Sequence, residues 1–188
     1  MKTKKIVLLG PLTYLNGVPG RYHFVRDWSG ARLPADVYLT PLDLICAAAY
    51  LRQYGYEVKI IEASIKHIHH LGLVKFIKQE SPDFALIPSV NFGIESDKYL
   101  SFLIRQSLPK IKLIFSGVLV TYNPGSVLFD CSADFTAVGE LEIPLLNILQ
   151  EGRGDNVVFL NDKQEIVVEK RRLIDLGELP PACPGFDR

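Results

Sequence analysis

Phe84-Ala-Leu-Ile87 and, further along, Ile111-Lys-Leu-Ile-Phe115 are the two short apolar runs that decide the fold. Between them, residues 96–107 carry apolar side chains at helical spacing, and Pro82 and Pro109 stand just before the two runs. A buried strand, a helix and a second buried strand in this order predict a parallel βαβ unit. The chain on both sides of this unit follows the same alternation.

Further strands are expected at 6–9, 58–61 and 135–138, and further helices at 41–52, 71–78 and 141–150. Strands that alternate with helices five times predict the α/β class, with a parallel sheet covered on both faces. We therefore expect a flavodoxin-like (Rossmann-like) three-layer fold with a five-stranded parallel sheet in the order 2-1-3-4-5.

The sequence pattern changes after Gly152-Arg-Gly154. Residues 157–169 predict a C-terminal β-hairpin, and Pro180-Pro181 is typical of an extended linker. We expect an α/β domain over residues 1–152, followed over residues 153–188 by a hairpin and a linker toward a further domain that this chain lacks.

The composition disfavours several classes of protein. The 188 residues include 21 Lys plus Arg and 21 Asp plus Glu, and a formal net charge of zero argues against a nucleic-acid partner. No apolar run approaches the roughly 20 residues of a membrane span. The three cysteines, Cys46, Cys131 and Cys183, are an odd number without a pairing pattern, which argues against a disulfide framework. No two are close enough in sequence to suggest a zinc or iron–sulfur motif. We expect a cytoplasmic protein.

A ligand site is expected at the carboxyl ends of the strands, because open α/β sheets bind ligands where their strand order reverses. In the predicted order, that point lies between the first and third strands. The loops at this edge are 10–40, 88–93, 116–122 and 139–142. Gly117 and Gly139 each follow a strand directly, where a missing side chain lets a ligand approach backbone amides. For either glycine alone, a turn requirement is the simpler explanation.

Two common uses of this fold are disfavoured by missing motifs. The chain contains neither G-x-G-x-x-G nor G-x-x-x-x-G-K-[ST], whose glycines and lysine hold phosphates. The first strand ends in Gly10-Pro11-Leu12, without the aspartate of a phosphoacceptor receiver. A dinucleotide or nucleoside-triphosphate site of the usual kind and a response-regulator role are therefore disfavoured.

Segments in a fixed order carry a resemblance to a known family. They are Tyr38-Leu-Thr-Pro-Leu-Asp-Leu44 with residues 47–63, Pro82-Asp-Phe84, Ser116-Gly117-Val118, Val138-Gly-Glu-Leu-Glu142, and residues 174–182. In these segments the chain resembles the cobalamin-binding domain at the amino end of many cobalamin-dependent radical-SAM enzymes. The resemblance extends over nearly the whole chain, and it implies cobalamin bound base-off at the carboxyl ends of the strands.

The resemblance also implies a set of cofactor-binding residues in the loops that follow the strands. They are Leu12, Thr13, Tyr14, Thr40, Pro41, Ser89, Val90, Asn91, Ser116, Gly117, Val118, Thr121, Gly139, Glu140 and Glu142. The small residues among them would leave room for the dimethylbenzimidazole tail, and Leu12, Tyr14 or Leu15 would cover the lower face of the cobalt. Glu140 and Glu142 would form a wall of the site rather than a catalytic pair.

The chain departs from the family pattern in two motifs and in its extent. Ser116-Gly117-Val118-Leu119 stands where Gly-Gly-Pro-His is usual, and Leu141 replaces the middle glycine of Gly-Glu-Gly-Glu. The C-x-x-x-C-x-x-C motif is absent, so a [4Fe-4S] cluster and S-adenosylmethionine are expected only in a C-terminal part outside this chain. The resemblance implies a fragment or stand-alone module that is not catalytic alone. Its partner would be a radical-SAM domain in cis or in trans, and the full protein would carry out methyl transfer or a related radical reaction.

Two other function classes stay open from the sequence. They are a cofactor-free interaction or regulatory module of the same fold, and a sugar-nucleotide-binding half-domain. The run His67-Ile-His-His70 suggests a metal or an axial cobalt ligand, but it follows the second strand and is better explained as solvated surface. His23, in the first loop, and Arg171-Arg172 are interpreted as an ordinary loop histidine and a solvated basic run.

Overall fold

The computed structural model describes residues 3–10, 14–15, 18–19, 41–63, 68–90 and 93–173, together with Asp175, Gly177 and Leu179. Statements about structure below concern these residues.

Five parallel strands form the centre of the sheet. They are β1 (Lys5–Leu9), β4 (Glu57–Ile61), β5 (Phe84–Pro88), β6 (Lys112–Ser116) and β7 (Phe135–Ala137). Their order is β4-β1-β5-β6-β7, which confirms the predicted order 2-1-3-4-5. Both faces are covered, and no residue from Ile6 to Leu9 is more than 1% exposed.

The C-terminal hairpin continues this sheet. β8 (Val157–Leu160) pairs antiparallel with β7, and β9 (Ile166–Val168) pairs antiparallel with β8. The sheet therefore has seven strands, where the sequence suggested five and a hairpin beside them. The buried pair Ala137 and Val157 joins the two parts, so a division at residue 152 falls inside one hydrogen-bonded sheet.

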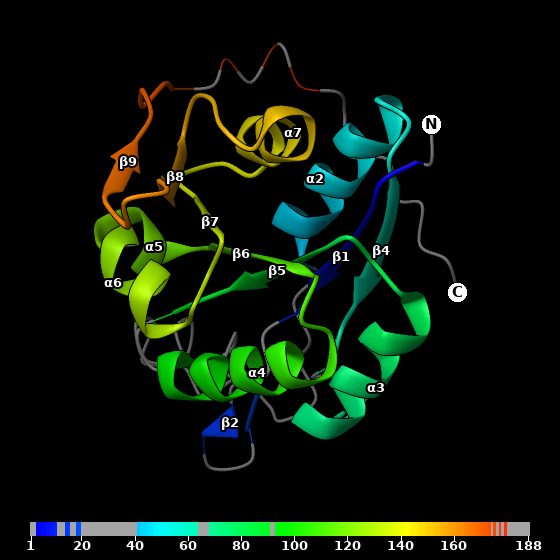
Figure 1. Cartoon of the computed structure of the whole chain (residues 1–188). Helices are drawn as coiled ribbons and strands as arrows, with labels where there is room; N and C mark the ends of the chain where they lie inside the picture. The colour runs from blue at the N-terminus through cyan, green and yellow to red at the C-terminus, as the bar shows by residue number, and fades with distance from the viewer. Residues whose placement is uncertain are drawn as a thin grey trace, which may run out of the picture.

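Helices cover both faces of the sheet, which gives the three predicted layers (Figure 1). One face carries α2 (Leu42–Gln53) and α7 (Glu142–Glu151), and the other carries α3 (His70–Glu80), α4 (Ile94–Ser107), α5 (Val118–Tyr122) and α6 (Pro124–Asp130). Each face has its own apolar core. Alternate residues of β1 serve the two cores: Leu8 packs with the α2/α7 cluster, and Val7 packs with the cluster under α3 and α4.

Local signals explain where several helices begin and end. Gly152, at φ 72°, ends α7 in the left-handed conformation that glycine adopts without strain. Asn123 accepts a hydrogen bond from the Ser126 N–H and precedes Pro124, so α6 has a side-chain cap and a proline at its first position. Within the described part of the chain, no helix has the length and apolar character needed to cross a membrane.

Two small features, a short helix and a two-stranded hairpin, were not predicted. α5 follows β6 where the sequence suggested only a loop, and β2 (Tyr14–Leu15) pairs antiparallel with β3 (Val18–Pro19) inside the first long loop. Both are too short to produce a periodic pattern, since α5 has five residues and each of the two strands has two.

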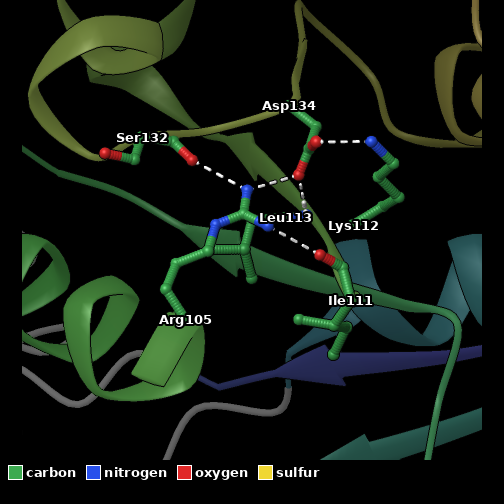
Figure 2. Close-up of polar contacts among 6 residues, drawn as sticks. All are labelled: Arg105, Ile111, Lys112, Leu113, Ser132 and Asp134. Atoms are coloured by element: carbon green, nitrogen blue, oxygen red, sulfur yellow. Dashed lines mark hydrogen bonds and ion pairs between the residues drawn. The ribbon is translucent and has the colours of Figure 1, made fainter. Parts of the chain in front are cut away.

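Arg105, near the end of α4, connects three segments at the amino edge of the sheet (Figure 2). Its guanidinium donates to the backbone oxygens of Ile111 and Ser132 and to the carboxylate of Asp134. Lys112 Nζ also donates to Asp134, over 2.8 Å. The cluster therefore fixes the starts of β6 and β7 against α4, opposite the edge where a ligand is expected.

Candidate functional site

The described candidate residues gather at the carboxyl edge of the sheet, as the sequence analysis expected. Pro41 is the N-cap of α2, Ser89 and Val90 follow β5, and Ser116 ends β6. Gly117, Val118 and Thr121 begin and form α5, and Gly139, Glu140 and Glu142 lead from β7 into α7. Leu12, Thr13, Thr40 and Asn91 lie outside the described residues, and Tyr14 is described only as part of strand β2.

Ser116 and Ser89 face opposite sides of the sheet. Ile114 belongs to the α2/α7 core, and Ser116, two residues later on the same strand, faces the same way. Ser89 is turned toward α4, where its Oγ donates a hydrogen bond of 2.7 Å to Asp97 Oδ2. Of these two small residues, Ser116 is the one placed to leave room on the α2/α7 side.

Gly117 and Gly139 are glycine for different physical reasons. Both have positive φ, 100° and 79°. At Gly117 a Cβ atom would lie 2.5 Å from the backbone oxygen of Ser89, so any side chain would collide with the end of β5. At Gly139 a Cβ atom would meet nothing within 4 Å among the described residues. Packing within the protein therefore accounts for Gly117, whereas Gly139 borders open space at the edge.

A cavity of about 280 Å³ lies beside Gly139. Thr121, Gly139 and Glu140, three of the candidate residues, line it together with Val138, Asn156, Arg171, Arg172 and Leu173. The last four come from the segment after α7, where the sequence analysis placed no site. Arg171-Arg172, interpreted there as a solvated run, borders this cavity while both residues remain exposed.

Asn156 holds the segment after β9 against the cavity. Its Nδ2 donates to the Arg172 backbone oxygen, and its Oδ1 accepts from the Arg172 N–H, both over 2.8 Å. The Asn156 backbone N–H donates to Lys170 O, and its backbone oxygen accepts from the Val138 N–H. This buried side chain therefore joins the end of β7 to residues 170–172, which no sequence motif indicated.

An acidic group lies where the first turns of α2 and α7 meet. Glu142 is 5% exposed, and burial raises the pKa of its carboxyl, with the nearby Glu140 and Asp43 adding to the effect. Burial, and then the Glu142 and Asp43 carboxylates, also raise the pKa of the half-buried Cys46 thiol. Within the described residues, Glu142 Oε2 has no hydrogen-bond partner. A neutral hydrogen-bond donor would suit this place better than an anion.

The described histidines stand at the start of α3, on the face of the sheet opposite α2 and α7. His70 Nε2 is 2.8 Å from Ser96 Oγ, and its ring packs edge-on against Tyr99, so it joins α3 to α4. Burial lowers the pKa of His70. No group of three or more His, Cys, Asp or Glu side chains suited to a metal ion occurs in the described part of the chain. His23 and His67 lie outside it.

Comparison with protein families identifies this arrangement. The family model described as the B12 binding domain matches residues 30–149, which is more than half of the chain. The chain belongs to the B12-binding domain family. This membership confirms the resemblance found in the sequence, with cobalamin as the cofactor, and it includes every strand of the parallel sheet except β1.

Solved structures with the fold of this B12-binding domain include two radical S-adenosylmethionine enzymes. The methyltransferase TsrM from Kitasatospora setae, with cobalamin and a [4Fe-4S] cluster bound, is 13% identical with a TM-score of 0.67 over 97% of this chain and 32% of its own. The cobalamin-dependent enzyme OxsB, with aqua-cobalamin and S-adenosylmethionine bound, is 13% identical with a TM-score of 0.72 over 95% of this chain and 24% of its own. The B12-binding domain thus spans about a third or a quarter of these chains. No curated protein sequence matches it significantly.

The residues at the carboxyl edge of this B12-binding domain fit a corrinoid, which carries amide groups around an apolar ring. Counting only the described residues, Gly139 opens onto free space and the buried Glu142 Oε2 lacks a donor. Thr121, Glu140 and Asn156 line the adjoining cavity. A cavity of about 280 Å³ is just below the range of about 300–1,000 Å³ that is usual for small-molecule sites. It can therefore hold one part of so large a cofactor, such as its rim.

Proposed function

We propose that this chain holds cobalamin base-off at the carboxyl edge of its sheet, as the cofactor module of a radical-SAM enzyme. The family match over residues 30–149 is the observation that carries the proposal. The open space at Gly139 and the unsatisfied oxygen of Glu142 support this placement.

In this proposal several candidate residues each have a defined role in binding the cofactor. Ser116 leaves room on the α2/α7 side of the sheet, where the nucleotide tail would lie. Thr121 and Glu140 bind amides at the corrin rim, Asn156 holds residues 170–172 beside the cavity, and Glu142 accepts a hydrogen bond from another rim amide. Bound cobalamin would supply a cobalt centre that takes up and gives away a methyl group. The chain itself binds and orients the cofactor and excludes water from it.

The partner in this proposal is a radical-SAM domain, in cis or in trans, that carries the [4Fe-4S] cluster and S-adenosylmethionine. TsrM and OxsB, the similar structures, are both radical S-adenosylmethionine enzymes. The full protein would carry out methyl transfer or a related radical reaction. A cytoplasmic location is part of the proposal, and the free thiols of Cys46 and Cys131 support a reducing compartment.

The proposal is tested by titrating the chain with hydroxocobalamin and following visible absorbance. We expect saturable binding and the spectral change of base-off cobalamin. Gly139→Leu should weaken binding about tenfold or more, because its side chain would occupy the open space beside the cavity.

Gly55→Leu is a matched control. Gly55 has φ 81°, and no described residue lies within 4 Å of an added Cβ, but Gly55 lies between α2 and β4 at the other edge. Both variants carry the same backbone strain, so only a loss specific to Gly139→Leu supports the site. Equal losses would place the cofactor elsewhere, and an unchanged cobalamin spectrum would leave a cofactor-free interaction module as the better explanation.

A further inference from the structure

A carboxyl group is buried beneath the end of β5. Asp97, in the first turns of α4, is 2% exposed, and its Oδ2 accepts the 2.7 Å hydrogen bond from Ser89 Oγ. Among the described residues, no cation pairs with it. Lys98, the next residue, pairs instead with Glu95 and lies 3.7 Å from Asp130. A buried carboxyl group without a cation is costly, so a role beyond filling the core is worth testing.

The elements packed around Asp97 bring one other titratable group close to it. Cys131, at the end of α6, is buried, and burial followed by the proximity of Asp97 raises the pKa of its thiol to about 12. From β5 the facing group is the Ser89 hydroxyl, and on α3 His70 is engaged with Ser96. Cys131 stays neutral around pH 7, so Asp97 is the group whose charge can change there.

Ser89 contacts both Asp97 and the residues at the carboxyl end of β6. The Ser89 N–H donates to Ser116 O over 2.7 Å, and the Ser89 backbone oxygen lies against Gly117. Asp97, Ser89, Ser116 and Gly117 thus form a continuous line from α4 through the ends of β5 and β6 to the start of α5.

We propose that Asp97 is a positioning residue for the cofactor site and acts through Ser89. The inference rests on the proposed function, because the edge that Asp97 holds is the edge where cobalamin would bind. The hydrogen bond keeps the end of β5 against α4, and Ser116 and Gly117 then keep their places beside the cofactor.

A pH dependence follows from this arrangement. Burial outweighs the hydrogen bond from Ser89 and raises the pKa of Asp97 to about 7. Above that pH the ionised carboxylate draws water toward itself, and water reaches it only if α4 parts from the end of β5. Cofactor affinity should therefore fall as the pH rises through about 7.

The test measures the affinity of the 188-residue chain for methylcobalamin at about pH 6 and about pH 8.5. This probe is chosen because its methyl ligand has no proton to lose. We expect wild type to bind about tenfold more weakly at the higher pH, and Asp97→Asn to bind equally at both, because asparagine keeps a hydrogen bond to Ser89 but cannot ionise. Asp97→Ala should bind weakly at both.

Ser101→Ala is the matched control, because Ser101 lies one turn further along α4 and is 2% exposed. Its buried Oγ has no hydrogen-bond partner in the part of the chain that the structure describes. This variant should bind like wild type. Parallel pH profiles of wild type and Asp97→Asn would overturn the inference while the proposed function stands. Equal losses in Ser101→Ala and Asp97→Ala would also overturn it. If wild type fails to bind at either pH, the proposed function falls, and the inference falls with it.

Discussion

Among single residues, Asp97 should dominate the pH dependence of stability around neutrality. Its pKa is about 7 in the folded chain and about 3.9 when unfolded, so the folded state binds more protons between these values. The free energy of unfolding therefore falls as pH rises from about 4 to about 7, by at most about 4 kcal/mol from this group. Asp97→Asn should remove that loss.

Urea unfolding of wild type and Asp97→Asn at several pH values measures this effect. The two curves of stability against pH should separate on the way from about pH 4 to about pH 7 and run parallel above it. Curves that stay parallel throughout would show that Asp97 is not buried as described.

Gly117 and Gly139 should respond differently to the same substitution. Gly139→Ala meets only the strain of a left-handed backbone, about 1–2 kcal/mol. Gly117→Ala adds a collision with the Ser89 oxygen and should cost about 3 kcal/mol or more. Chemical denaturation of both variants compares them, and equal losses would contradict the close approach of Gly117 to β5.

The sequence was enough to locate both glycines, but it could not show that each position requires glycine for a different physical reason. Each stands at the end of a predicted strand, which is enough to place it at the carboxyl edge of a parallel sheet. What a Cβ would meet depends on the neighbouring strand, and that is visible only in three dimensions. The bond between Ser89 and Asp97 was missed for the same reason, because an aspartate four residues into a helix is ordinarily solvent-exposed.

Among the elements, α4 is anchored at its far end by Arg105 (Figure 2). Arg105→Ala removes hydrogen bonds to Asp134 and to two backbone oxygens, and it should lower the free energy of unfolding by about 2 kcal/mol. Lys112→Ala, which removes a half-exposed partner of the same carboxylate, should cost less than about 1 kcal/mol.

Urea titration measures both losses, and cobalamin titration supplies a second readout. The cluster lies at the amino edge, so neither variant should change cobalamin affinity. Equal destabilisation by the two variants would mean that the three bonds of Arg105 do not act together.

The long elements were predictable because each is an apolar run or an amphipathic helix bounded by proline or glycine. β5 was expected at 84–87 and occupies Phe84–Pro88, and the helix expected at 96–107 is α4, Ile94–Ser107. α5 was missed because Val118-Leu-Val-Thr-Tyr122 is β-branched and aromatic, a composition that favours strands over helices. Its helical form is set by packing, with Val120 fully buried in the core beneath α4.

At the scale of the whole molecule, the hairpin should be part of the same cooperative unit as the parallel strands. Val157 and Val158 are almost fully buried, and β8 covers the edge of β7. A chain that ends after Gly152 would expose that edge and part of the core, so it should aggregate or unfold without a sharp transition. A chain that ends after Leu173 should unfold much like the full chain.

Size-exclusion chromatography and urea unfolding of the two truncated chains test whether the hairpin unfolds together with the parallel strands. A monomeric, cooperatively unfolding chain of residues 1–152 would show that the hairpin is an independent appendage, as the sequence pattern alone suggested.

The hydrogen bonds between Asn156 and the Arg172 backbone determine the edge of the sheet at which the chain leaves the hairpin. The chain enters β8 beside Asn156 at the carboxyl edge, crosses the sheet twice, and is held at the same edge again. With one strand or three after β7 in place of two, the chain would end at the opposite edge of the sheet, roughly 15 Å away for a strand of four or five residues. An even number means that anything joined after Arg172 starts beside the carboxyl edge, where we propose that cobalamin binds. On a short flexible tether, its effective concentration there is on the order of millimolar, so even a weak contact with the carboxyl edge would be largely formed.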